Sequence, residues 1–337
     1  MSFIPAQTYC DPLDIEWSEP EIISLQDKND IFLKSDLSIL LDGNKIAITW
    51  IKGKVGNSSL YLFLKDDSGK SIIQVTKGHE DRDPRIFKFK DKYHIIFSRR
   101  IIETNNEIKS YMTPSILMIT DSTNLQDWSI PRIIRINLKN QDNHEPFIFI
   151  DGENLRILWT TGNFEFEIFY SETTDLKTFS APKRLFNLKG PIHYPYLLKT
   201  KNSKCLLFFQ LKHSLYFSQS LYFTAWKKPK YMMKHSSREY RPAIIQLPDE
   251  RILVFFNSAA FIWYTENLEK YNYDNWFKPI QLNLKKSNEK FKDYMIQEIH
   301  PVIAQDKAGN LHLTWSSKRN GLWNIYYSAG KVEKNTK

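Results

Sequence analysis

The sequence predicts an all-β protein, a six-bladed β-propeller with four-stranded blades. Two recurring patterns indicate this fold: a pair of strands that occurs six times, and a Trp/Phe-x-x-Pro motif that occurs five times. β-Propellers repeat a four-stranded blade around a central channel, and such repeats are typically about 40 to 50 residues long. The six strand pairs follow one another at comparable intervals and begin near positions 36, 83, 145, 194, 241 and 300.

Each strand pair has the same internal pattern. It begins with a polar residue, usually followed by Pro, and continues with an apolar run, a turn and a second apolar run. "EPFIFIDGENLRILW", from Glu145 to Trp159, places the turn at Asp151-Gly152. Alternating runs on both sides of an Asp-Gly turn are typical of a β-hairpin. In five of the six pairs an aromatic residue stands 14 positions after the first residue, and the pair that begins at His300 has one extra residue. These aromatic residues are expected to pack between blades.

A third strand follows each pair, as in "EIFYSET" and "NIYYSAG", and the Trp/Phe-x-x-Pro motif predicts a fourth. Proline suits an outer edge strand, because its missing N–H interrupts no hydrogen-bonded ladder there. The first blade is the exception, since its outer strand "SIIQVT" lacks both Trp and Pro.

The order of the elements predicts how the ring closes. The first motif copy, in "IEWSEPEIISL" at 15–25, has no blade before it, and the strand at 323–329 has no outer strand after it. We therefore expect residues 15–25 to complete the sixth blade, so that residues 1–337 form a single domain without an open sheet edge.

Composition narrows the function classes. The net charge of +9 is compatible with an acidic partner such as an anionic glycan, although the Lys residues are scattered and suit solvated loops equally well. The scatter does not favour nucleic acid. The sequence lacks an apolar run of about 18 residues, so no membrane span is expected, and the absence of a signal-peptide pattern leads us to expect a cytoplasmic protein. We expect a monomer that needs no cofactor.

The first strand of a propeller blade lines the central channel, so residues at its start should gather around one mouth of that channel. All six such residues are polar or ionisable: Asp36, Asp83, Glu145, Tyr194, Arg241 and His300. Polar groups that converge in a concave site are the default candidates for function. Three of them are carboxylic acids, which is the equipment that glycoside hydrolysis requires: one group to protonate the leaving oxygen and a second to attack or to activate water.

Two families share these motifs. "SETTDLKTFSAP" and "TDSTNLQDWSIP" resemble the Asp-box, or BNR-like, repeats of sialidase-type propellers. They also resemble the corresponding turns of five-bladed glycosidases such as arabinanases and invertase-like enzymes. "RDPRIF" at 82–87 is similar to the Arg-Asp-Pro motif of the invertase-like group, and "HEPFIF" at 144–149 is similar to the segment that carries its acid. The resemblance implies Glu145 as general acid, Asp83 as the residue that orients substrate and tunes the acid's pKa, and Asp36 as nucleophile or base.

A sialidase-like mechanism would use other residues. The sequence offers Arg85, Arg238 and Arg241 as carboxylate-binding groups, with Tyr194 and Tyr240 as candidates for the nucleophilic tyrosine. The Arg-Ile-Pro motif that opens that family is absent, so sialic acid hydrolysis is not favoured. His144, His193 and His300 lie at or beside strand starts and could bind sugar hydroxyls. Their spacing does not match a metal site, so no metal is predicted.

The leading functional hypothesis is therefore a glycoside hydrolase that acts on a glycan at the channel mouth. The alternatives are a non-catalytic propeller that binds a glycan or a protein, and a polysaccharide lyase that acts on an acidic glycan. Carboxylates close together across an open pocket would favour hydrolysis, whereas carboxylates engaged in blade-to-blade hydrogen bonds would favour binding alone.

Overall fold

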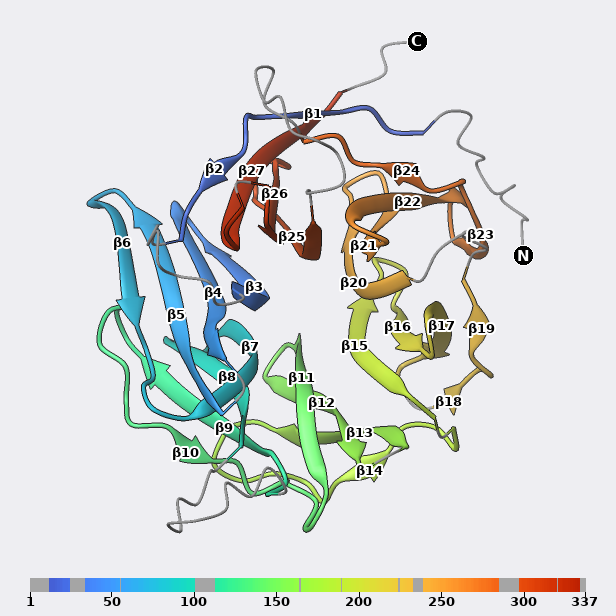
Figure 1. The fold of residues 1–337 in the computed structure, drawn as a ribbon. Helices are drawn as coiled ribbons and strands as arrows, with labels where there is room; N and C mark the ends of the chain where they lie inside the picture. The colour runs from blue at the N-terminus through green and yellow to red at the C-terminus, as the bar shows by residue number, and fades with distance from the viewer. Residues whose placement is uncertain are drawn as a thin grey trace.

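The structure of the chain is a computed structural model that describes residues 12–24, 34–54, 56–100, 113–163, 165–188, 190–223, 225–232, 239–284, 297–319 and 321–333. These residues form β-strands and connecting turns, with no helix among them. The strands surround a central axis in a β-propeller arrangement (Figure 1). The all-β propeller predicted from the sequence is confirmed.

Strands of the same rank in each repeat occupy equivalent places. The innermost strands are β3 (Lys34–Asp42), β7 (Glu80–Phe89), β11 (Asp142–Asp151), β15 (Ile192–Lys199), β20 (Glu239–Gln246) and β25 (Glu298–Gln305). Each pairs with a second strand: β4 (Lys45–Lys54), β8 (Lys92–Arg100), β12 (Asn154–Gly162), β16 (Lys204–Leu211), β21 (Ile252–Ser258) and β26 (Leu311–Ser317). The third strands are β5 (Asn57–Asp66), β9 (Ile116–Ser122), β13 (Phe166–Thr173), β17 (Ser214–Leu221), β22 (Phe261–Glu269) and β27 (Asn324–Val332).

The outer strands are shorter. They are β1 (Ile15–Trp17), β2 (Glu21–Ile22), β6 (Gly69–Gln74), β10 (Arg132–Ile133), β14 (Lys183–Arg184), β18 (Ala225–Trp226), β19 (Lys230–Tyr231), β23 (Asn272–Trp276) and β24 (Ile280–Gln281). Hydrogen bonding joins the described strands into five sheets, because β3–β6 and β7–β10 form one sheet of eight strands. A parallel bridge between Ser58 and Glu80 connects these two groups. The predicted number of blades depends on how this sheet is divided.

The N-terminal segment is the outer strand of the last sheet. β1 runs antiparallel to β27, with Ile15 opposite Val332 and Trp17 opposite Gly330, and β2 pairs farther along the same strand. This is the pairing that the sequence predicts for residues 15–25, of which Leu25 lies outside the described residues. Gly330 permits the close approach, because a Cβ atom there would lie 2.8 Å from the Trp17 ring.

The Trp/Phe-x-x-Pro motif is fixed by one repeated hydrogen bond. In each of its five copies, a Ser or Thr hydroxyl of the third strand donates to the carbonyl that follows the motif's aromatic residue. The pairs are Ser328–Ser18, Thr120–Ser129, Ser171–Ser180, Ser218–Lys227 and Thr265–Phe277, at 2.5 to 2.7 Å. The N-terminal copy therefore makes the same contact as the four internal copies.

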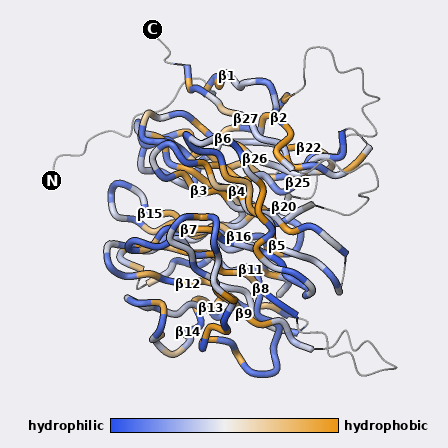
Figure 2. Tube along the Cα trace, turned by 90° about the vertical axis from the view of Figure 1, so that its left-hand side faces the viewer, coloured by the Kyte–Doolittle hydropathy of each residue, from blue (hydrophilic) through white to orange (hydrophobic). Residues whose placement is uncertain are grey.

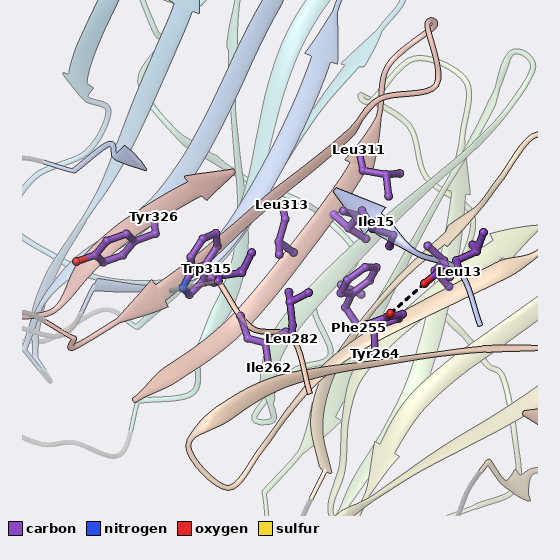
Figure 3. Close-up of a cluster of buried hydrophobic side chains, with 14 of the residues drawn as sticks. Leu13, Ile15, Phe255, Ile262, Tyr264, Leu282, Leu311, Leu313, Trp315 and Tyr326 are labelled. Carbon is purple, nitrogen blue, oxygen red and sulfur yellow. Dashed lines mark hydrogen bonds between the residues drawn. The ribbon is translucent and has the colours of Figure 1, made fainter. Parts of the chain in front are cut away.

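Apolar side chains pack between neighbouring sheets. Trp50, Phe97, Trp159 and Trp315 are at most 1% exposed, which confirms the prediction that the repeated aromatic residues form the core. Figure 2 shows hydrophobic and hydrophilic stretches alternating along the chain from the side. Leu13 and Ile15 from the N-terminal segment pack into the cluster of Figure 3, where the Tyr264 hydroxyl donates to the Leu13 carbonyl at 3.1 Å.

Candidate functional site

The six polar residues singled out in the sequence occupy one equivalent position, at a bulge in each innermost strand. Register shifts interrupt the pairing at every one of them: Asp36, Asp83, Glu145, Tyr194, Arg241 and His300. All six have a positive φ, between 51° and 57°. The residues therefore lie two or three positions inside their strands, a correction to the expectation that they stand at strand starts.

The bulges explain the prolines that follow five of these residues. A bulge leaves one residue outside the ladder, so a residue without an N–H fits there even in an inner strand. A positive φ is unusual for residues such as Glu, Tyr and Arg, and backbone strain of this kind clusters at functional sites. We call these six residues the bulge ring.

Among the described residues, hydrogen bonds from a backbone N–H to the side chain of the preceding member join three of the six neighbouring pairs in the bulge ring. The Glu145 N–H donates to Asp83 Oδ2 at 3.4 Å, and the Tyr194 N–H donates to Glu145 Oε2 at 2.9 Å. The ring closes from the last strand to the first, because the Asp36 N–H donates to His300 Nδ1 at 3.4 Å. The structure thus brings together residues up to 264 positions apart in the sequence.

Arg241 neutralises Asp36. Its Nη1 forms an ion pair with Asp36 Oδ1, and its guanidinium lies 4.2 Å from the centroid of the Tyr194 ring. Burial raises the pKa of Asp36, but the charge and hydrogen bond of Arg241, together with smaller contributions from His300 and Arg82, outweigh it and lower this pKa to about 2. Burial and the same positive charge hold the pKa of His300 well below its usual value, so His300 is neutral and its Nδ1 can accept a hydrogen bond.

Glu145 is also ionised. His193 Nδ1 lies 3.0 Å from Glu145 Oε1, while Thr160 Oγ1 donates to Oε2 at 2.9 Å. Burial raises the pKa of Glu145, but the hydrogen bond from His193, the charges of His144 and His193, and the Tyr194 amide together lower it to about 2. Burial lowers the pKa of His193, but its hydrogen bond to Glu145 and the negative charges of Glu145 and Asp83 together outweigh burial, so this pKa is raised.

Asp83 is in the opposite situation. It is buried between Asp36 and Glu145, and the described hydrogen bonds to its side chain are two contacts of 3.4 Å, from Ser98 Oγ and from the Glu145 amide. Burial, followed by the negative charges of Asp36 and Glu145, raises the pKa of Asp83 to about 6.

The pKa shifts run opposite to the roles expected from the sequence. Glu145 was predicted to be the protonated acid and Asp83 to tune its pKa, whereas the pKa of Glu145 is lowered to about 2 and that of Asp83 is raised to about 6. The physical reason is His193, which lies against Glu145 and stabilises its ionised form.

Three of the predicted residues are not members of the bulge ring: Arg85, Tyr240 and Arg238. Arg85 donates to the carbonyls of Leu37 and Pro84, at 3.2 and 2.9 Å, and lines a central cavity of about 280 Å³ together with Tyr194, Arg241, His300 and apolar residues of the inner strands. The Tyr240 hydroxyl is 3.5 Å from His213 Nδ1, outside the ring. Arg238 lies outside the described residues.

Two hydroxyl residues beside the carboxylates were missed. Ser98 contacts Asp83 and Thr160 contacts Glu145, and each stands 15 positions after its carboxylate, directly behind the repeated aromatic residue. A hydroxyl at that position of the repeat was the available signal. Among the described residues, no group of three His, Cys, Asp or Glu side chains could hold a metal ion, and no helix is long and apolar enough to cross a membrane.

Comparisons with known proteins agree on the fold. No family model and no curated protein sequence matches the chain. A protein of unknown function from Dyadobacter fermentans superimposes with a TM-score of 0.69, at 14% identity over 95% of this chain and 99% of that chain. A mutant α-L-arabinofuranosidase from Fusarium graminearum, in complex with an iminosugar inhibitor, gives 0.68 at 12% identity, over 94% and 98%.

Trypanosoma rangeli sialidase, in complex with the inhibitor DANA, gives a TM-score of 0.63 at 8% identity. It matches 89% of this chain but only 55% of its own length. The chain has the fold of these propellers. At such low identities the likeness concerns the fold alone.

Proposed function

We propose that the chain is a glycoside hydrolase whose active site is the bulge ring. The observation that carries the proposal is the split in protonation among three buried carboxyl groups, with Asp83 protonated up to about pH 6 between two ionised neighbours. Glycoside hydrolysis requires such a pair of acid and carboxylate. The solved structures that share the fold include an arabinofuranosidase and a sialidase, which supports the same class of reaction.

In this mechanism Asp83 is the general acid that protonates the leaving oxygen. Asp36 is the nucleophile or base, because the described contacts of its carboxylate engage Oδ1, through Arg241, while both oxygens of Glu145 are engaged. Burial, followed by the like charges of Asp36 and Glu145, keeps Asp83 protonated below about pH 6. His193, Tyr194, Arg241 and His300 would hold the sugar or orient the carboxylates.

We further propose that the propeller has six blades in a single domain, with the eight-stranded sheet counted as two blades joined by the bridge between Ser58 and Glu80. Six equivalent bulges and five equivalent motif contacts support this division. The N-terminal segment then supplies the outer strand of the sixth blade.

A non-catalytic glycan-binding propeller is the second candidate. It is favoured by the backbone N–H bonds that Asp83 and Glu145 accept from neighbouring strands, because such bonds also suit a purely structural role. The lyase alternative is weaker, since burial raises the pKa of Tyr194 and a tyrosine base needs the opposite shift.

Kinetics on a panel of glycosides test the proposal. The panel contains α-L-arabinofuranosides, sialosides and neutral pyranosides, each with good and poor leaving groups. Asp83→Asn should lower turnover by about 10²–10⁴-fold, the usual contribution of general acid catalysis, and least for good leaving groups. Asp151→Asn, at an exposed turn where Asp151 pairs with Lys199, is the control and should keep the wild-type rate. Glycan binding without any turnover by the wild type would refute the hydrolase proposal and favour the non-catalytic glycan-binding propeller.

A further inference from the structure

A second cavity, of about 180 Å³, lies between the inner strands β7 and β11. Its lining residues include Glu80, Arg82, Arg100, Asp142, His144 and Phe166. Arg82 and His144 directly precede members of the bulge ring, so this side cavity adjoins the carboxylates. It is smaller than the roughly 300–1,000 Å³ of pockets for drug-sized ligands, which suits one sugar residue.

The charges that line the side cavity are balanced. Arg82 Nη2 lies 2.5 Å from Glu80 Oε1, and Arg100 lies 3.5 Å from Asp142 and 3.7 Å from Glu80. A ligand carboxylate could form an ion pair with one of these guanidinium groups only if an existing ion pair were broken. Neighbouring carboxylates and guanidinium groups instead offer acceptors and donors side by side, which match the hydroxyl groups of a neutral sugar.

Unsatisfied polar atoms and an aromatic ring complete the surface. His144 Nε2 and Arg100 Nε are buried and have no hydrogen-bond partner among the described residues. Such atoms are costly unless a ligand or water meets them. The Phe166 ring, 4.9 Å from the His144 ring and 5.0 Å from the His193 ring, gives the cavity an apolar wall.

Ser98 connects the side cavity to the proposed acid. Ser98 is one of the residues that line the cavity, and its hydroxyl contacts Asp83 Oδ2 at 3.4 Å. An acid must reach the oxygen that joins the scissile bond to the leaving group. The sugar next to Ser98 is therefore the leaving one.

We infer that the side cavity is a subsite for a neutral sugar residue on the leaving-group side of the scissile bond. The inference rests on the proposed hydrolase function and narrows its substrate to glycans whose leaving-side residue is uncharged.

The test compares Arg82→Met with Arg184→Met. Arg82 is nearly half exposed, so its variant should fold. The matched control is Arg184, which lies on the outer strand β14 and forms an ion pair with Glu167 of β13. The probes are α-1,5-arabinotriose and xylotriose as neutral oligosaccharides, 3′-sialyllactose as an acidic one, and 4-nitrophenyl α-L-arabinofuranoside, which has no leaving sugar. Arg82→Met should lower kcat/KM for the cleaved neutral oligosaccharide about tenfold more than for the aryl glycoside, mainly through KM. Arg184→Met should behave as wild type.

The outcomes separate this inference from the proposed function. Turnover of neutral oligosaccharides with no selective effect of Arg82→Met would overturn the subsite and leave the hydrolase intact. A second outcome is that the wild type cleaves no probe while NMR detects binding of arabinotriose or xylotriose that Arg82→Met weakens about tenfold. That result would refute the hydrolase function and support the side cavity as a sugar-binding site. Preference for sialyllactose, or neither binding nor turnover of the neutral probes, would overturn the subsite.

Discussion

Replacing Asp83 by Asn should stabilise the folded protein at neutral pH. One pKa unit corresponds to about 1.4 kcal/mol, so a buried carboxyl whose pKa rises from 3.8 to about 6 lowers the free energy of unfolding above pH 6 by about 3 kcal/mol. Asn has nearly the same shape, can accept the same contacts and tolerates the positive φ of 51° at this position. It carries no charge, so the penalty disappears.

The pH dependence of this effect has a definite sign. Folded Asp83 binds its proton more tightly than the unfolded chain does, so its stabilising contribution is complete below pH 3.8 and is lost as the pH rises through about 6. Wild type and Asp83→Asn should therefore differ little at pH 3.5 and most at pH 7. Glu145→Gln is the paired control with the opposite sign, because the pKa of Glu145 is lowered and its replacement removes a stabilising ion pair with His193.

Urea unfolding at pH 3.5, 5 and 7, followed by tryptophan fluorescence, measures these differences. The expected result is a higher midpoint for Asp83→Asn and a lower midpoint for Glu145→Gln at pH 7, with unchanged slopes. Equal destabilisation by both variants would refute the electrostatic reasoning, since it would mean that Asp83 is a structural hydrogen-bond acceptor like Glu145.

Three further predictions follow from the structure. Leu13→Ala should lower the free energy of unfolding by about 2–5 kcal/mol in a urea titration, because Leu13 is 2% exposed in the hydrophobic cluster between the N-terminal segment and the last two sheets. Ile130→Ala, at a position that is 90% exposed, should change the free energy of unfolding by less than about 0.5 kcal/mol. Equal effects of the two variants would contradict the conclusion that the N-terminal segment stabilises the last sheet. The rate of glycoside cleavage should fall as the pH rises above about 6, where Asp83 loses its proton, and Glu145→Gln should move this limb to lower pH by removing a like charge. Arg241→Gln should raise the pKa of Asp36 and shift the acidic limb of the same profile to higher pH, and an unmoved limb would exclude Asp36 as the ionised group.

The fold could be predicted because its signals are local and repeated. Alternating apolar runs, Asp-Gly turns and the Trp/Phe-x-x-Pro motif each reflect one blade's own hydrogen bonding and packing. The same repeat located the six members of the bulge ring, since equivalent sequence positions become equivalent places around the axis. The bulges themselves were missed, although a proline inside an inner strand is a sign of one.

The electrostatics of the site could not be read from the sequence in the same way. The pKa of Glu145 depends on His193, which comes from the next inner strand, and the pKa of Asp36 depends on Arg241, 205 positions away. The motif resemblance gave the role of protonated acid to Glu145, because a resemblance transfers a residue's role to the matching sequence position. The pKa of each carboxyl group is set by its burial and by the charges beside it, and both are properties of the closed ring.

The most direct test of the account is the titration of the three carboxyl groups by ¹³C NMR, with Asp83→Asn, Glu145→Gln and Asp36→Asn used for assignment. The account predicts that the Asp83 carboxyl titrates near pH 6, while Asp36 and Glu145 remain ionised down to about pH 2. Titration of Glu145 near pH 6, with Asp83 ionised below pH 4, would contradict it.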